Sequence, residues 1–251
     1  MGKYLAPALD KGLDIIEYLS MKAIPQSQME ISQGLEKSPN EIYRMLVCLE
    51  QRGYLIKETP SGKFSLSLKL YHLSHRHSPV DELVKLSKPF MEELSNESKQ
   101  SCHMGILHHG NLMVVSQMRS PGPVSLSIEE GSLFSLIKTT SGRVLLAFMN
   151  ETRQKQILAD DKDYNELSKE KKADLMLRLQ KIRDRGYDLE KSELTMGVAD
   201  IAVPVGDSQS GIFSALAISS LASISSKNES GEFLINKITE AVTSINTALG
   251  F

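Results

Sequence analysis

Three polar residues, Asn40, Tyr43 and Arg44, share one face of a helix that the sequence predicts after Ser38. An arginine can donate two hydrogen bonds to guanine O6 and N7 or pair with a phosphate, and a tyrosine can donate to a phosphate or press against a thymine methyl group. The opposite face is apolar and requires a core: Ile42, Met45, Leu46 and Leu49. If that core forms, the polar face is free to enter the major groove of DNA. The alternative is that Tyr43 and Arg44 form only a solvated helix face.

Two serines precede predicted helices with a glutamate three residues later, which is the pattern of a capping box. In Ser27-Gln28-Met29-Glu30 and Ser38-Pro39-Asn40-Glu41, the serine hydroxyl accepts from the glutamate amide and the carboxylate accepts from the serine amide. We therefore expect the Glu41 carboxylate to turn to the start of its helix. The free amides at helix starts favour phosphate oxygens, so Ser27, Gln28 and Ser38 join the candidate DNA-binding residues.

Three short helices and a hairpin within about 65 residues predict a winged helix-turn-helix. The first helix has an apolar stripe formed by Leu9, Leu13, Ile16 and Leu19, with Ile15 beside it. The second helix has an inner face of Met29, Ile31 and Leu35. After Gly53, residues 54–56 and 64–68 are predicted strands. Lys57 and Lys63 lie on or beside this wing, where they would contact DNA. We expect Cys48 to be a small buried residue.

The composition is that of an ordinary globular chain. Its 251 residues exceed the usual size of one domain and predict two. The longest apolar run, residues 144–149, is too short to span a bilayer, and the N-terminus lacks the apolar core of a secretion signal. Two cysteines suit a reducing compartment, so we expect a cytoplasmic protein with no membrane partner. Residues 1–77 carry 10 Lys and Arg against 8 Asp and Glu, whereas the remainder is net negative.

The second half predicts an α+β domain with an antiparallel sheet. Strands are expected at 101–107, 112–118, 198–205 and 212–219, and helices at 80–97, 139–149, 168–185 and 233–249. The organisation is therefore a DNA-binding domain at 1–70, a linker and linker helix at 71–98, and a second domain at 99–251. We expect the helix at 80–97 to join two chains, because one winged helix covers too little DNA for tight binding.

These residues resemble the IclR-type bacterial transcription regulators. In the first half the resemblance is carried by Ala8–Ile16 (ALDKGLDII), Asn40–Leu46 (NEIYRML) and Leu49–Leu55 (LEQRGYL). In the second half it is carried by Lys138–Ala147 (KTTSGRVLLA), Gly186-Tyr187, Met196–Val205 (MGVADIAVPV) and Gly211–Ser219 (GIFSALAIS). The resemblance implies a winged helix-turn-helix joined by a linker helix to a GAF-like effector-binding domain. It also implies a homodimer or homotetramer that binds a double-stranded DNA operator and represses or activates a catabolic operon in response to a metabolite.

The resemblance also implies an effector site beside the helix that starts near Thr140. Its residues would be Met118, Thr140, Ser141, Glu190, Asp200, Ala217 and Ser219. Asp200 stands where many family members have cysteine, and Ala217 stands where some have serine. Two acids near one pocket would repel an anion, which favours a polyhydroxylated, neutral or amine-bearing effector. A sugar acid with its carboxylate at the helix start stays open, as does an Asp200 that only bonds to backbone.

The sequence contains none of the common motifs of enzymes or of metal sites. There is no nucleophile elbow, P-loop, dinucleotide-binding glycine pattern or zinc-protease motif, so we expect neither an enzyme nor a cofactor. His103, His108 and His109 are close in sequence, but their spacing matches no strong zinc motif, and we expect no metal. The alternatives are an enzyme built on the α+β domain and a winged helix that binds protein instead of DNA.

Overall fold

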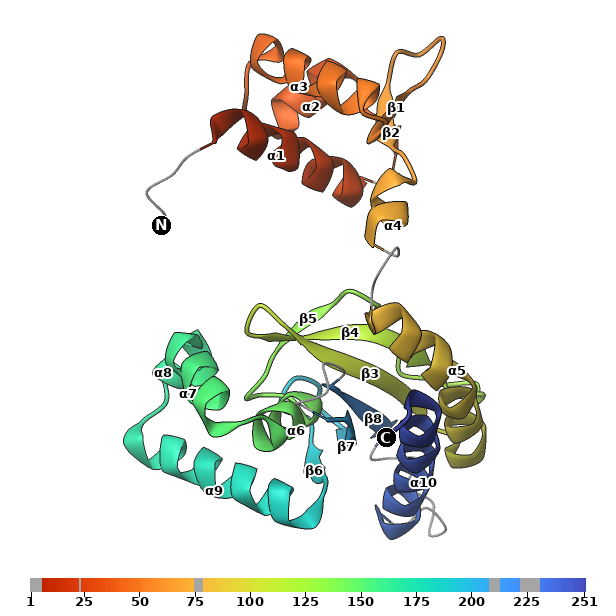
Figure 1. Cartoon of the computed structure of the whole chain (residues 1–251), viewed down its shortest axis with the longest axis vertical. Helices are drawn as coiled ribbons and strands as arrows, with labels where there is room; N and C mark the ends of the chain where they lie inside the picture. The colour runs from red at the N-terminus through yellow and green to blue at the C-terminus, as the bar shows by residue number, and fades with distance from the viewer. Residues whose placement is uncertain (1–5, 23, 75–78, 208–212, 222–230) are drawn as a thin grey trace. The chain divides into compact units, whose positions relative to one another are not determined.

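The computed structural model describes residues 6–22, 24–74, 79–207, 213–221 and 231–251. The chain divides into two compact units, Met1–Ser78 and Pro79–Phe251 (Figure 1). The helix predicted at residues 80–97 is α5 (Pro79–Ser98), which lies in the second unit. The residues assigned to a linker helix are therefore packed into the second domain.

The first unit is a winged helix-turn-helix, as predicted. Its described elements in chain order are α1 (Pro7–Lys22), α2 (Gln28–Gly34), α3 (Pro39–Gln51), β1 (Leu55–Lys57), β2 (Phe64–Leu66) and α4 (Lys69–Ser74). The two strands pair antiparallel and form the wing directly after α3. Residues from all three main helices and the wing form one buried core: Ile15, Leu19, Ile31, Ile42, Leu46, Leu55 and Phe64.

The inner face of α1 differs from the predicted stripe. Leu9 and Leu13 are 61% and 47% exposed, whereas Ile15, Tyr18 and Leu19 are buried. The helix is apolar on two sides, and packing against α3 buries the side that carries Ile15. Two smaller expectations are also wrong, since Met29 is mostly exposed and Cys48 is exposed on α3.

Both predicted capping boxes are present. The Ser27 and Ser38 hydroxyls accept from the amides of Glu30 and Glu41 at 3.2 and 3.4 Å. The Glu30 and Glu41 carboxylates accept from the amides of Ser27 and Ser38 at 2.6 and 3.0 Å. Short-range hydrogen bonds thus set where α2 and α3 begin, and hence which face of α3 is turned outward.

Replacing Ser38 with alanine is expected to lower the free energy of unfolding of the first unit by about 1 kcal/mol, because the cap of α3 is lost. Urea unfolding followed by circular dichroism measures this change. Ser38→Asp keeps a good cap and should stay near wild type. Ser61→Ala, on the exposed wing, serves as the matched control, and equal losses in both alanine variants would contradict the capping role.

The second unit is built on a six-stranded antiparallel sheet with the order β5-β4-β3-β8-β7-β6. The strands are β3 (Ser101–His108), β4 (Asn111–Met118), β5 (Leu133–Ser135), β6 (Asp188–Lys191), β7 (Val198–Gly206) and β8 (Phe213–Leu221). The helices after α5 are α6 (Thr140–Phe148), α7 (Glu151–Asp160), α8 (Lys162–Asn165), α9 (Lys169–Arg185) and α10 (Gly231–Leu249). The predicted α+β class is confirmed.

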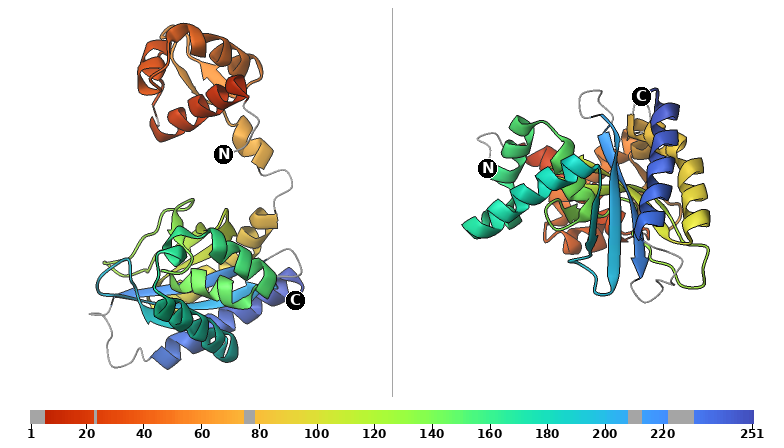
Figure 2. Two further views of the ribbon diagram at one scale, coloured as in Figure 1. Left: turned by 90° about the vertical axis from the view of Figure 1, so that its left-hand side faces the viewer. Right: turned by 90° about the horizontal axis from the view of Figure 1, so that it is seen from below.

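Helices cover both faces of this sheet. α5 and α10 lie on one face, and α6 and α9 lie on the other, as the edge-on view shows (Figure 2). Each face has its own core, with Met104, Leu216 and Ile238 on the α5 and α10 side and Leu145, Leu179 and Ala217 on the α6 side. Among the described residues, no helix is long and apolar enough to cross a membrane.

Candidate functional site

The polar face of α3 is open to solvent. Tyr43 is 55% exposed, and Asn40 and Arg44 are exposed as well. Ile42 and Leu46 on the opposite face are completely buried in the core of the first unit. The unit therefore presents the three side chains that could read a DNA groove, and their contact with DNA stays a prediction.

The charge of Glu41, which would repel a phosphate, is compensated within the unit. Its Oε2 accepts from the Ser38 amide and its Oε1 accepts from Lys11 Nζ, both at 3.0 Å. The hydrogen bond from the Ser38 amide, assisted by Lys11, lowers the pKa of Glu41 to about 2. The carboxylate thus stays ionised and turned to the helix start, as the capping box predicts.

The other candidate DNA-binding residues differ in their partners. Gln28 Nε2 donates to the Pro39 carbonyl at 3.0 Å, which ties α2 to the start of α3. Lys63 Nζ lies 3.3 Å from Glu30 Oε2 and so pairs with the capping carboxylate of α2. Lys57 is exposed on the wing, with its Nζ 5.4 Å from the Phe64 ring centroid. Of these three, Lys57 is the most available to a phosphate.

A cavity of about 420 Å³ lies in the second unit between the sheet and the start of α6; we call it the α6 cavity. The sheet contributes His103, Leu112, Phe134, Val198, Asp200 and Ser219, and the start of α6 contributes Thr139, Thr140 and Ser141. Two loops complete it with Leu126, Ser127, Ile128, Glu129, Ser132, Ser192, Leu194 and Thr195. No motif or periodic pattern in the sequence predicts these loop residues as part of the site.

The start of α6 can bind an acceptor group. Thr139 Oγ1 accepts from the Gly142 amide at 3.2 Å and donates to the Ser135 carbonyl at 2.9 Å. The amides of the first turn have no acceptor within the helix, so those of Thr140 and Ser141 can donate to a carboxylate or a hydroxyl. A Cβ on Gly142 would lie 2.4 Å from the Leu136 carbonyl oxygen, so only glycine permits this close packing.

Asp200 and His103 are two titratable groups in the lining of the α6 cavity. Burial raises the pKa of Asp200, although a hydrogen bond from Ser219 and the nearby Arg143 oppose the rise. Ser219 Oγ donates to Asp200 Oδ1 at 2.6 Å. Burial lowers the pKa of His103 to about 4, so the ring is neutral at pH 7 and lies 3.3 Å from Ser141 Oγ through Nε2. The lining thus places the partly buried Asp200 carboxylate among hydroxyl groups.

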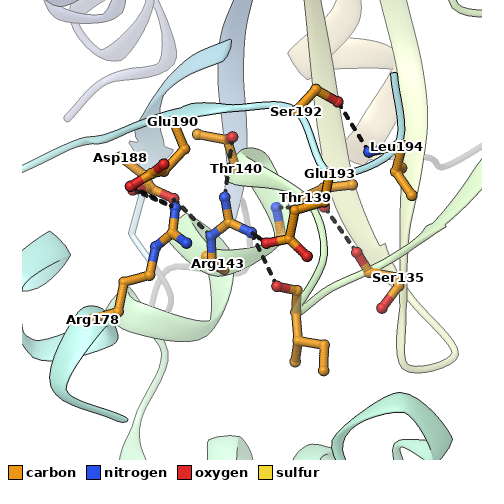
Figure 3. A network of polar contacts seen from close by, with 12 residues as sticks. Ser135, Thr139, Thr140, Arg143, Arg178, Asp188, Glu190, Ser192, Glu193 and Leu194 are labelled. Atoms are coloured by element: carbon orange, nitrogen blue, oxygen red, sulfur yellow. Dashed lines mark hydrogen bonds and ion pairs between the residues drawn. The ribbon is translucent and has the colours of Figure 1, made fainter. Parts of the chain in front are cut away.

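A buried ionic cluster lies behind the start of α6. Asp188 is 0% exposed and contacts three guanidinium groups, those of Arg143 at 2.8 Å, Arg178 at 3.3 Å and Arg185 at 2.8 Å. Arg143 reaches Glu193 at 3.4 Å, and Arg178 reaches Glu190 at 3.5 Å. We call these six residues the Asp188 network; Figure 3 shows part of it. Its members span residues 143–193, and no sequence motif predicts the network.

The sequence matches two profiles of one family. Residues 78–247 match the bacterial transcriptional regulator IclR C-terminal domain, and residues 8–58 match the IclR helix-turn-helix domain. The chain belongs to the IclR family. It is therefore a DNA-binding transcriptional regulator and not an enzyme.

Three relatives illustrate the similarity. The HTH-type transcriptional regulator KdgR of Escherichia coli is 31% identical over 192 residues, which are 76% of this chain and 73% of KdgR. The glycerol operon regulatory protein of Streptomyces coelicolor is 26% identical over 178 residues, 71% of this chain and 70% of that protein. The crystal structure of an IclR homolog from Microbacterium hydrocarbonoxydans complexed with 4-hydroxybenzoate has a TM-score of 0.78 at 18% identity, and the match covers 96% of this chain and 98% of the homolog.

Four of the effector residues implied by the IclR resemblance line the α6 cavity, and Met118 does not. Met118 pairs with Cys102 and packs on the α5 and α10 side of the sheet. A β-bulge between Met104 and Gly105 shifts the register with β4, so Leu112 faces the cavity while Met118 faces the opposite side. A shift of one residue moves every later side chain to the other face. The expectation that Met118 forms a cavity wall is wrong.

Glu190 and Ala217 lie on the cavity side of the sheet but outside the cavity lining. Glu190 is the cross-strand neighbour of Asp200, yet its side chain is half exposed and pairs with Arg178. Ala217 is buried in the core beneath α6. The pairing with Arg178 corrects the expectation that Glu190 and Asp200 share the pocket, and the acids in the lining are the partly buried Asp200 and the exposed Glu129.

His103, His108 and His109 do not gather around a common point. His103 lines the α6 cavity, whereas His108 and His109 contact each other at the β3–β4 turn, with ring centroids 4.4 Å apart. Across the part of the chain that the structure describes, no group of three His, Cys, Asp or Glu side chains is placed to hold a metal ion.

Proposed function

We propose that the chain represses a catabolic operon and that a small polyhydroxylated metabolite, bound in the α6 cavity, releases it from DNA. The observation that carries this proposal is the partly buried Asp200 carboxylate, which lies beside Ser219 and in the same cavity as the start of α6. The exposed face of α3, with Asn40, Tyr43 and Arg44, supports the DNA-binding half of the proposal.

The cavity chemistry favours an effector with several hydroxyl groups. Asp200 accepts from Ser219 and retains acceptor capacity for hydroxyl or amine hydrogens of a ligand. A carboxylate close to Asp200 would meet a like charge in a site of low dielectric. A polyol or an amine-bearing sugar avoids that repulsion. A sugar acid also fits if its carboxylate accepts from the amides of Thr140 and Ser141 and its hydroxyls face Asp200.

The name of the Streptomyces coelicolor relative, a glycerol operon regulatory protein, supports the same class of compound, because glycerol is a polyol. A thermal-shift screen of polyols, sugar acids and amines tests the class, since a ligand at 100 times its Kd stabilises by about 2.7 kcal/mol. The compound that binds should then weaken operator binding. A compound that strengthens it would overturn the proposed direction of control.

Replacing Asp200 with asparagine is expected to weaken effector binding and to stabilise the second unit at neutral pH. Because burial raises the pKa of Asp200, its ionised form is less favoured in the folded chain than in the unfolded chain. The stability from this group is complete below its ordinary pKa and is lost as pH rises through the raised pKa. Asparagine cannot ionise and still accepts from Ser219. The Asp200→Asn chain should therefore not lose this stability as pH rises.

Thermal unfolding from mildly acidic to neutral pH measures the stability difference, and calorimetric titration with the compound from the screen measures binding. Glu190→Gln is the matched control, because it removes the neighbouring carboxylate, which pairs with Arg178 and does not line the cavity. An Asp200→Asn chain with wild-type affinity for the compound would refute the role of Asp200.

We further propose that the chain acts as a homodimer or homotetramer. A single winged helix covers too little DNA to reach a Kd near ~10⁻⁸ M without a partner. The outer face of α5, whose inner face packs on α10 and the sheet, is the proposed contact between copies. Sedimentation velocity is expected to give a dimer or tetramer, and a monomer at micromolar concentration would contradict this proposal.

A further inference from the structure

Arg143 does not line the α6 cavity, yet it bonds to segments that do. Its side chain is 2% exposed and projects from the second turn of α6. Nη1 donates to the Ile137 carbonyl at 3.0 Å and Nη2 donates to Thr140 Oγ1 at 3.3 Å. Nε donates to Asp188 Oδ2 at 2.8 Å and Nη1 also reaches Glu193 Oε1 at 3.4 Å. One guanidinium therefore joins α6, the segment before it, β6 and the loop after β6 (Figure 3).

The bond to Thr140 sets the direction in which that hydroxyl can act. A guanidinium has donors and no acceptor, so Thr140 Oγ1 must accept from Arg143. The hydroxyl hydrogen of Thr140 is then left for another acceptor, and Thr140 is a lining residue of the cavity. Arg143 thus presents Thr140 as a donor to whatever occupies the cavity.

The bond to Glu193 holds a wall of the cavity. Ser192, Leu194 and Thr195, the neighbours of Glu193, line the α6 cavity. Within this loop the Ser192 hydroxyl accepts from the amides of Leu194 and Thr195 at 3.3 and 3.2 Å, and the Ser192 amide donates to the Val198 carbonyl at 2.8 Å. These bonds shape the loop, and the Glu193 contact with Arg143 fastens it to α6.

The remaining partners keep the guanidinium in place. Asp188 is completely buried and also contacts Arg178 and Arg185 from α9. Arg143, Arg178 and Arg185 face Asp188, Glu190 and Glu193, so the charges of the Asp188 network balance. A guanidinium held in this way has little freedom to turn away from Thr140 and Glu193.

We propose that Arg143 is the positioning residue of the α6 cavity, which orients the Thr140 hydroxyl as a donor and fastens the Ser192–Thr195 wall through Glu193. The proposal rests on the proposed function only in taking the α6 cavity as the effector site. The contact between Arg143 and Glu193, which holds the wall against α6, can be tested without any effector.

Hydrogen–deuterium exchange of the full chain, without ligand, tests the wall. Glu193→Gln removes the ionic contact at a half-exposed position, and the amides of residues 192–198 are expected to exchange about fivefold faster. The melting temperature and the exchange of β3 should stay at the wild-type values, since nothing in the core changes. Unchanged exchange in this loop would overturn the proposal.

Glu190→Gln is the matched control, because Glu190 is also half exposed and paired with an arginine but contacts Arg178 instead of Arg143. It should leave the exchange of the 192–198 amides unchanged, and equal acceleration in both variants would refute a specific role of Arg143.

Arg143→Lys keeps the positive charge but loses the planar guanidinium with its several donors. The amides of the first turn of α6 and of the loop should therefore both exchange faster than in the wild type. If Arg143→Lys unfolds the unit, Glu193→Gln and Glu190→Gln decide the question. If no compound in the thermal-shift screen stabilises the chain, the proposed effector is contradicted, but the exchange results still test the role of Arg143.

Discussion

Replacing Asp188 with asparagine is expected to lower the free energy of unfolding of the second unit by about 3–5 kcal/mol. Asp188 is 0% exposed and its carboxylate faces Arg143, Arg178 and Arg185. Asparagine keeps the shape but removes the negative charge, which leaves the buried Arg143 guanidinium without its closest counter-ion. Removing one partner of a buried ion pair destabilises strongly because the other charge stays desolvated.

Urea unfolding of the full chain, followed at a signal from the second unit, measures this loss. Asp163→Asn is the matched control, since Asp163 pairs with Lys138 at the surface and the pair should contribute under about 1 kcal/mol. A loss in Asp188→Asn no larger than in Asp163→Asn would mean that the Asp188 network does not stabilise the fold.

The first unit could be predicted from sequence because its signals are local. Each capping box spans four residues, and the two boxes fixed where α2 and α3 start. From that start, the helical period placed Ile42 and Leu46 inside and Tyr43 and Arg44 outside, as observed. The same period failed for α1, because that helix has apolar residues on two sides and only packing selects between them.

The second unit depends on long-range pairing that no local pattern records. The β-bulge in β4 reversed the side on which Met118 lies, and alternation along the strand cannot reveal a bulge. Arg143 and Asp188 are 45 residues apart in the sequence and meet only because α6 packs beside β6. Thr140, Ser141, Asp200 and Ser219 were found through the IclR resemblance, whereas the loop walls of the cavity were not.

The departure at Asp200 shows why the IclR fold alone does not identify an effector. The backbone donors at the start of α6 do not depend on side chains, so they suit acceptor groups in general. The side chain at position 200 decides which ligand groups the other side of the cavity binds, and a partly buried carboxylate there favours hydrogen-bond donors. We therefore expect effector specificity to change with residue 200 while the fold stays the same.

Replacing Arg44 with alanine is expected to raise the Kd for the operator by about 10- to 100-fold, which is the range for loss of one bidentate contact to a base. Arg44 is exposed on α3, one turn from Asn40 and beside Tyr43, so its removal leaves the buried face of the helix unchanged. Fluorescence anisotropy with a labelled operator, repeated over a series of salt concentrations, measures both the affinity and its salt dependence.

The salt series separates the two contacts that Arg44 can make. If Arg44 binds a guanine edge, the variant loses sequence discrimination and keeps the wild-type salt slope. If it binds a phosphate, the slope falls by about one and the loss is similar on any sequence. Arg52→Ala, an exposed arginine at the C-terminal end of α3, is the matched control for net charge. An Arg44→Ala chain that binds as tightly as the Arg52→Ala chain at every salt concentration would show that this face of α3 does not contact the operator.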